Sequence, residues 1–472
     1  MENSKLYSIL QHFNKYEQNR FRKFVQSPYF NANPTLVRLF ETLVRHQNNG
    51  QEEELGKEHV WALLETGDPY DDVRFRKHCS DLLKLVETYL VQEVFQENPL
   101  HQATYLIEAV GRKKLEKLYN STMRSARRLS SQQPHQSAVY YFYQFQIEKN
   151  YYELTKHFRK RDPITNIEKV TLNLDLFFLA EKLKHYCRTL VHQYAVSHEY
   201  RIFLIEEIIA HVEQYRYEDI PPIAVYYQIY LALVNTEEEE HYYKLKELLE
   251  KHGLAFPQEE AADIYSYAIN YCTRKINKGN QNFLREYFDL YKDLLKKNIL
   301  IVEGEMLTGH FRNIVTVGLR LGEIQWTEDF IHEYKQYLPE AQRDNLVTFN
   351  LAQLYFYKKD YDAVIELLQH VEYDDVTYNL NSKTLLLLTY YETDEIEPLF
   401  SLTESFRAYL NRHKNIPTRR RRSYMQLIKF VKKLTRAMPG DRKQVSALRQ
   451  ELQAAKGVAS VKWIQEKIAE LE

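Results

Sequence analysis

Glycine is unusually scarce in this sequence, with only 12 among 472 residues, against an average usage of about 7%. Phosphate-binding loops, sheet sandwiches and α/β enzymes use glycine freely at their turns, so the composition argues against all of them. Apolar residues instead recur at steps of three and four, with little sustained alternation, which is typical of amphipathic helices. The stripe of Phe75, Cys79, Leu82, Val86 and Tyr89 predicts one long helix over residues 71–97. The pattern as a whole predicts an all-α protein.

The charge and the cysteine content narrow the class of protein further. Lys plus Arg number 64 and Asp plus Glu number 65, which excludes a uniformly basic nucleic-acid protein, and the 44% apolar content excludes wholesale disorder. The sequence starts without a secretory-type apolar core, and its longest apolar stretch, residues 223–234, falls far short of the roughly 20 residues of a membrane helix. Three scattered cysteines predict buried thiols. We therefore expect a cytoplasmic protein without a membrane span.

Proline and glycine divide the helical pattern into four predicted regions. These are an N-terminal helical domain at 1–100, a helical hairpin or connector at 101–163, a series of helix pairs at 164–410, and basic capping helices at 411–472. The hairpin arms are expected at 103–129 and 137–158, followed by a linker at 159–163.

Short connections predict that helices in the third region pack as antiparallel neighbours. The predicted pairs are 174–194 with 203–215, 222–234 with 237–251, 259–276 with 282–297, 306–321 with 327–337, 345–357 with 361–371, and 378–391 with 395–410. The run Thr236 to Glu239 fits a capping box at the start of one of these helices.

A period of 34 residues relates the last two helix pairs. The superposed residues are Leu351 with Leu385, Ala352 with Leu386, Phe356 with Tyr390, Tyr357 with Tyr391, and Asp360 with Asp394. Upstream, Val317-Gly318 falls in the same register as Leu351-Ala352. The period and the order FNLAQLYFYKKDYDAVI at 349–365 resemble the tetratricopeptide-repeat superfamily, most clearly over residues 310–405. The resemblance implies a right-handed superhelix, an α-solenoid over 164–410, whose concave groove holds a helix or extended segment of a partner protein.

Tyrosine is in excess, with 38 residues, several of them in doublets. In a doublet, one ring can pack inward while the other presents its hydroxyl to a groove, and tyrosine suits recognition surfaces. The candidate partner-binding residues are Tyr226, Tyr227, Asn350, Tyr357, Tyr390 and Tyr391. The alternative is that these residues only pack the core.

The C-terminal end is strongly basic, since residues 411–472 contain 16 Lys plus Arg and 5 Asp plus Glu. The candidate anion-binding residues are Arg419, Arg420, Arg421, Arg422, Lys429, Lys432, Lys433 and Arg436. They could bind a polyanion or a membrane surface, or form the solvated face of a cap that closes the solenoid. Charge asymmetry between this end and the rest of the chain also permits self-association.

No linear motif of catalysis or of cofactor binding occurs, since GxxxxGK[ST], GxGxxG, GxSxG and HExxH are all missing from the sequence. His185 and His192 lie two helical turns apart, too far to hold one metal together. The sequence therefore predicts a non-enzymatic scaffold or adaptor without cofactors. The alternative is a nucleic-acid-associated regulator that uses the basic end or the N-terminal domain, with the repeats as sensor. In that domain, residues 55–90 look somewhat like the helix-turn-helix portion of winged-helix regulators. An enzyme would need a pocket assembled from distant helices.

Overall fold

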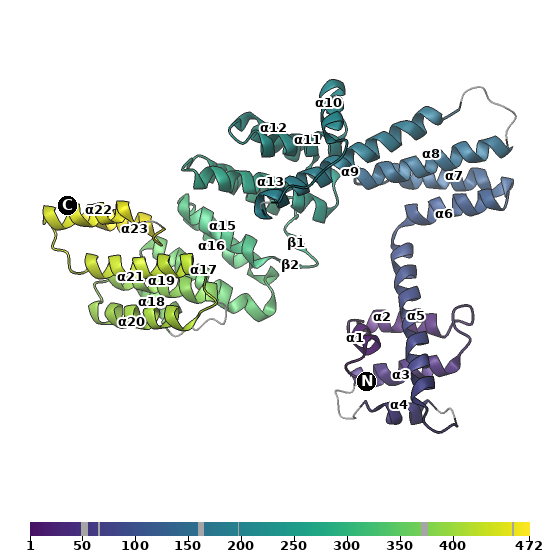
Figure 1. Cartoon of the computed structure of the whole chain (residues 1–472), viewed down its shortest axis with the longest axis horizontal. Coiled ribbons are helices and arrows are strands. Elements are labelled where there is room, and N and C mark those ends of the chain that lie inside the picture. Colours follow the sequence, from purple (N-terminus) through teal and green to yellow (C-terminus); the bar gives the residue numbers. More distant parts are fainter. Residues whose placement is uncertain (49–54, 65–66, 159–164, 197, 370–375, 456) are drawn as a thin grey trace. The chain divides into compact units, whose positions relative to one another are not determined.

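The computed structural model describes residues 1–48, 55–64, 67–158, 165–196, 198–369, 376–455 and 457–472. Over these residues the chain forms the helices α1–α23, two short 3-10 turns and one two-stranded hairpin (Figure 1). The prediction of an all-α protein is confirmed. The chain divides into two compact units, Met1–Lys182 and Leu183–Glu472.

The first unit begins with a small helical bundle. Its helices are α1 (Lys5–Gln11), α2 (Lys15–Val25), α3 (Pro34–Asn48), α4 (Lys57–Leu63) and α5 (Asp72–Glu97). Phe21, Phe40 and Phe75 meet in its fully buried core. The Asp71 carboxylate caps α5 by accepting hydrogen bonds from two backbone N–H groups of its first turn. The long helix predicted over 71–97 is confirmed.

Three further helices of this unit pack together around Ile107, Ala126 and Ile147. They are α6 (Pro99–Arg112), α7 (Glu116–Ser131) and α8 (Ala138–Phe158). The expectation of a single first arm over 103–129 is wrong, because the chain breaks between α6 and α7, where Lys114 takes a left-handed conformation with φ of 51°. The predicted linker 159–163 and the predicted boundary at 163–164 lie outside the described residues. The two units divide inside α9 (Ile167–Val196).

The second unit consists largely of successive helix pairs. After α10 (Ile205–Tyr215), the pairs are α11 (Pro221–Val234) with α12 (Glu239–His252), α13 (Gln258–Asn277) with α14 (Phe283–Lys296), α15 (Thr308–Arg320) with α16 (Ile324–Tyr334), α17 (Glu340–Lys358) with α18 (Tyr361–Leu368), and α19 (Val376–Glu392) with α20 (Ile396–Arg412). These five pairs match five of the six predicted ones. The sixth, 174–194 with 203–215, falls on α9 and α10, between which the described residues show no comparable packing. Each pair contacts the next, and α17 also packs on both α15 and α19.

Two local features of this unit differ from the sequence prediction. The strands β1 (Ile301–Val302) and β2 (Glu305–Met306) form a hairpin whose turn residues, Glu303 and Gly304, both have positive φ. The expected capping box at Thr236 is wrong, because α12 begins after Glu238 and has no side-chain cap. The Thr236 carbonyl instead accepts a hydrogen bond of 3.1 Å from the Tyr271 hydroxyl.

Buried tyrosines tie neighbouring pairs to one another. The Tyr226 hydroxyl donates to Glu260 Oε1 at 2.8 Å, and the Tyr242 hydroxyl donates to Glu286 Oε2 at 3.2 Å. Within one pair, the Tyr265 hydroxyl of α13 donates to a carboxylate oxygen of Asp293 in α14. A hydrogen bond to a charged acceptor contributes about 1.5–3 kcal/mol. Part of the tyrosine excess is therefore explained by packing together with these bonds.

The last three helices close the second unit. They are α21 (Thr418–Leu434), α22 (Arg442–Ala454) and α23 (Val461–Glu470), and they share one core with α19 and α20. The predicted apolar stripe of α21, which includes Leu427, Ile428 and Val431, is buried there. Glu392 of α19 accepts hydrogen bonds from Trp463 Nε1 at 2.6 Å and from Lys467 Nζ at 2.8 Å.

Candidate functional site

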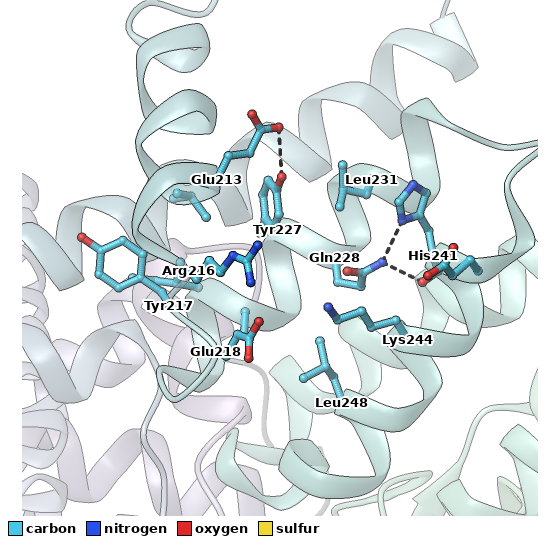
Figure 2. Close-up of a pocket in the computed structure, with 14 residues that line it drawn as sticks. Glu213, Arg216, Tyr217, Glu218, Tyr227, Gln228, Leu231, His241, Lys244 and Leu248 are labelled. Atoms are coloured by element: carbon cyan, nitrogen blue, oxygen red, sulfur yellow. Dashed lines mark hydrogen bonds between the residues drawn. The ribbon is translucent and has the colours of Figure 1, made fainter.

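A hollow of about 380 Å³ lies between α10, α11 and α12 (Figure 2). We call it the α10–α12 pocket. Its lining residues are Val212, Glu213, Arg216, Tyr217, Glu218, Ile223, Ala224, Tyr227, Gln228, Leu231, Glu240, His241, Lys244 and Leu248. They come from three helices and from the connection between α10 and α11, so the packing of these elements creates the pocket.

The apolar part of the pocket follows from the composition of α11. The sequence PPIAVYYQIYLALV is apolar almost all round. This helix therefore buries one face against its neighbours and still has apolar side chains on another face, which line the pocket. Ile223 and Val212 are buried beneath the hollow, whereas Leu231 and Leu248 are partly accessible at its sides. A ligand with an apolar group can therefore displace water here.

Two hydrogen-bonded pairs fix polar side chains in the pocket wall (Figure 2). The Tyr227 hydroxyl donates to Glu213 Oε1 at 3.0 Å, and burial, reinforced by this carboxylate, raises the pKa of Tyr227. Gln228 is only 4% exposed, and its Nε2 donates to the His241 carbonyl at 2.9 Å. Because the amide nitrogen is held by His241, the Gln228 carboxamide has a fixed orientation.

Charged groups of both signs complete the pocket. Figure 2 shows Arg216 and Lys244 extending toward the hollow from different walls, with Glu218 near the Arg216 side. Within the part of the chain that the structure describes, neither Arg216 nor Lys244 makes an ion pair. Arg216 follows α10 in a left-handed conformation with φ of 46°. Glycine is the usual residue there, so the arginine costs backbone energy while bringing a guanidinium to the pocket.

The predicted partner-binding residues fall into three groups. Tyr227 lines the pocket, and Tyr357 is 49% exposed on α17. Tyr226 is 1% exposed and Asn350 is fully buried, with its Nδ2 donating to the Leu346 carbonyl at 2.7 Å. These last two side chains belong to the interior and cannot form a recognition surface in this structure.

Tyr390 and Tyr391 are half-buried against the C-terminal core, where the Tyr391 ring lies 5.1 Å from the ring of Trp463. The structure does not bring the six predicted residues together at one site. Sequence reasoning missed Arg216, Gln228 and Lys244, because no motif or repeat position marks them. The only local signal was the run of polar residues between α10 and α11.

The predicted anion-binding residues are also divided by the structure. Lys429 and Lys433 both pair with Glu451, and these contacts lower the pKa of that carboxyl group. Lys432 pairs with Glu404.

The four arginines at the start of α21 and Arg436 have different surroundings. Arg421 donates to the His413 carbonyl at 3.1 Å, and Arg420 donates to Thr377 Oγ1 at 3.2 Å. Arg419, Arg422 and Arg436 are exposed and make no ion pair within the described ranges. Much of the basic stretch thus takes part in holding α21 to its neighbours.

Among the described residues, no group of three or more His, Cys, Asp and Glu side chains is arranged to hold a metal ion. The same residues contain no helix with the length and apolar character needed to span a bilayer. Comparisons with protein-family models, with curated proteins and with solved structures each gave no match.

Proposed function

We propose that this protein is a non-enzymatic scaffold or adaptor that binds a segment of a partner protein in the cytoplasm. Its helix pairs would form an α-solenoid of tetratricopeptide-like units, with a concave groove as the binding surface and α21–α23 as the cap. The α10–α12 pocket would receive side chains of the bound segment.

The packing of the second unit supports this architecture. Helices that are neighbours in sequence are neighbours in space from α11 to α20, and α17 also contacts the first helices of the pairs on both sides. A helix pair in such an array buries its apolar face only against adjacent pairs. The array therefore leaves side chains such as Tyr357 and Tyr227 accessible on its surface.

The observation that carries the proposal is the composition of the α10–α12 pocket. Apolar side chains lie beside Arg216 and Lys244, which make no ion pair with any residue that the structure describes, and beside the fixed carboxamide of Gln228. A peptide segment offers the matching groups, since its side chains supply apolar and charged groups and its backbone N–H groups can donate to an amide oxygen.

An affinity experiment with matched variants tests the proposal. The full chain is immobilised and exposed to cytosolic extract of the source cell, and bound proteins are quantified by mass spectrometry. The pocket variant is Arg216→Gly with Lys244→Ala, which removes both cations and relieves the left-handed strain at residue 216. Lys251→Ala is the control, because Lys251 is exposed on the same helix as Lys244 but does not line the pocket.

We expect the recovery of a specific protein to fall about tenfold or more for the pocket variant and to stay unchanged for the control. Two charge-assisted contacts can account for such a loss. Circular dichroism melts of all variants verify that the fold is retained. Equal recovery by intact protein and pocket variant would refute the assignment of this pocket.

A further inference from the structure

A second hollow, of about 610 Å³, lies in the first unit between α2 and α5. We call it the α2–α5 groove. Its lining residues are Tyr16, Asn19, Arg20, Lys23, Phe24, Phe30, Tyr89, Gln92, Glu93 and Gln96. This part of the chain shows no resemblance to helical repeats, so the groove is independent of the function proposed above.

The groove is lined by aromatic rings. Phe24 and Phe30 stack with their ring centroids 4.2 Å apart, and Tyr89 lies 5.7 Å from Phe24. Tyr16 at one end is 68% exposed, and Tyr29, whose ring contacts Phe30, is 89% exposed. Large aromatic side chains with this much exposed surface are typical of recognition sites.

The loop that carries Tyr29 and Phe30 is held in place by hydrogen bonds. Asn31 Nδ2 donates to the Val25 carbonyl at 2.8 Å and to the Asn33 carbonyl at 3.0 Å. Asn31 Oδ1 in turn accepts from the Asn33 backbone N–H at 2.9 Å. The exposed rings are therefore positioned before any partner arrives, which lowers the entropic cost of binding.

The polar lining consists of carboxamides, which both donate and accept hydrogen bonds, of the Arg20–Glu93 ion pair, and of Lys23. Arg20 Nη2 bridges Glu93 at 2.8 Å and Gln96 at 3.2 Å, so the Glu93 charge is neutralised. Gln92 supplies a further amide. Lys23 is exposed and has no ion-pair partner within the residues that the structure describes.

We propose that the α2–α5 groove binds a proline-rich segment of a partner protein in the polyproline II conformation, with an acidic residue facing Lys23. Proline rings pack flat against aromatic side chains, and aromatic-lined grooves are the usual receptors of such segments. A polyproline II backbone has no internal hydrogen bonds, so its carbonyl groups need donors such as the Gln92 amide. Lys23, for which the described part of the chain offers no ion-pair partner, selects a carboxylate.

Single-stranded nucleic acid is the other ligand that aromatic rings and cations can hold. The charge of this region disfavours it, because residues 1–100 contain 12 basic and 15 acidic residues. We therefore treat nucleic-acid binding as one of the outcomes that would overturn the proposal.

Fluorescence anisotropy with the full chain provides the test. The probe is a Glu-hexaproline peptide with a C-terminal fluorescein, compared with a peptide in which alternating glycine and serine replace the prolines. The variants are Tyr16→Ala and Lys23→Glu, both at exposed positions that line the groove. The matched control is Tyr105→Ala, because Tyr105 is 52% exposed on α6 and does not line the groove.

We expect saturable binding of the proline peptide, an affinity about fivefold lower for Tyr16→Ala, and no change for Tyr105→Ala. Lys23→Glu is expected to favour a Lys-hexaproline probe over the Glu-hexaproline probe. The proposal is overturned by any of three results: no binding at about 1 mM probe, binding that the groove variants leave unchanged, or tighter binding of a ten-residue deoxythymidine oligomer.

Discussion

The contact between α15 and α16 gives the sharpest test of the packing. An added Cβ at Gly318 of α15 would lie well inside the van der Waals distance of Thr327 Oγ1, and 3.6 Å from Phe288 Cε2. Thr327 is fully buried, and its Oγ1 donates to the Glu323 carbonyl at 2.7 Å. The threonine therefore cannot move aside without losing a hydrogen bond.

Two opposing effects decide how Gly318→Ala changes the free energy of unfolding. Replacing glycine by alanine inside a helix stabilises it by about 1 kcal/mol, whereas overpacking a buried site costs about 1–3 kcal/mol. Gly309 lies in the same helix, and a Cβ added there would meet no atom within 4 Å. Gly309→Ala therefore carries no packing cost, and as the second residue of α15 it gains at most the first effect. The difference between the two variants is thus a lower bound on the packing cost, which we expect to be about 1–3 kcal/mol.

Native-state hydrogen exchange, followed by mass spectrometry on peptides from α15 and α16, measures both variants. Exchange in these peptides should become faster for Gly318→Ala and slower for Gly309→Ala. The double variant Gly318→Ala with Thr327→Ala should show a favourable coupling energy, because the clashing atom has been removed. If Gly318→Ala protects α15 as well as Gly309→Ala does, the close approach of these two helices is incorrect.

Three further predictions concern buried charges and thiols. Glu392→Gln should destabilise the second unit by about 2 kcal/mol in urea unfolding, because the buried Lys467 then keeps only the exposed carboxylate of Glu470 as its ion-pair partner. A loss of unfolding free energy below about 0.5 kcal/mol would contradict this prediction. Burial lowers the pKa of His310, so the contribution of His310 to stability should be constant above about pH 7 and be lost on acidification. His310→Asn should remove this part of the pH profile of the unfolding midpoint. Burial raises the pKa of the Cys272 thiol to about 12, and it also raises the pKa of the Cys187 thiol. Ellman's reagent at pH 8 should therefore modify these thiols only after unfolding.

The sequence predicted helices best where an apolar stripe coincided with a start signal. The helix over 71–97 had both, and its Asp71 cap is present. The break after α6 was missed because Lys114, which takes the left-handed conformation there, carries no glycine or proline signal. The box at Thr236 failed because α12 begins two residues further on, after Glu238, and the Thr236 carbonyl bonds to the Tyr271 hydroxyl of another helix. Local sequence describes local hydrogen bonds, and tertiary contacts can replace them.

The candidate sites depend on tertiary contacts more strongly than the helices do, and the sequence predicted them less well. Of the predicted tyrosines, Tyr227 faces a pocket while its neighbour Tyr226 is buried. A doublet indicates that the two rings lie on different faces of a helix, but not which face its neighbours cover. The α2–α5 groove was missed altogether, because its aromatic residues are separated by more than 50 positions between Phe30 and Tyr89 and meet only in the folded bundle.

By itself, the sequence determined that this protein is built from helices, where most of them begin and end, and which of them form pairs, because helical periodicity and turn residues act over a few positions. Only the tertiary structure decided which tyrosines are accessible, which lysines are neutralised by carboxylates, and which side chains surround each hollow. Those properties depend on the packing of helices that are distant in sequence, and the burial and charge pairing of a side chain are set by its neighbours in space.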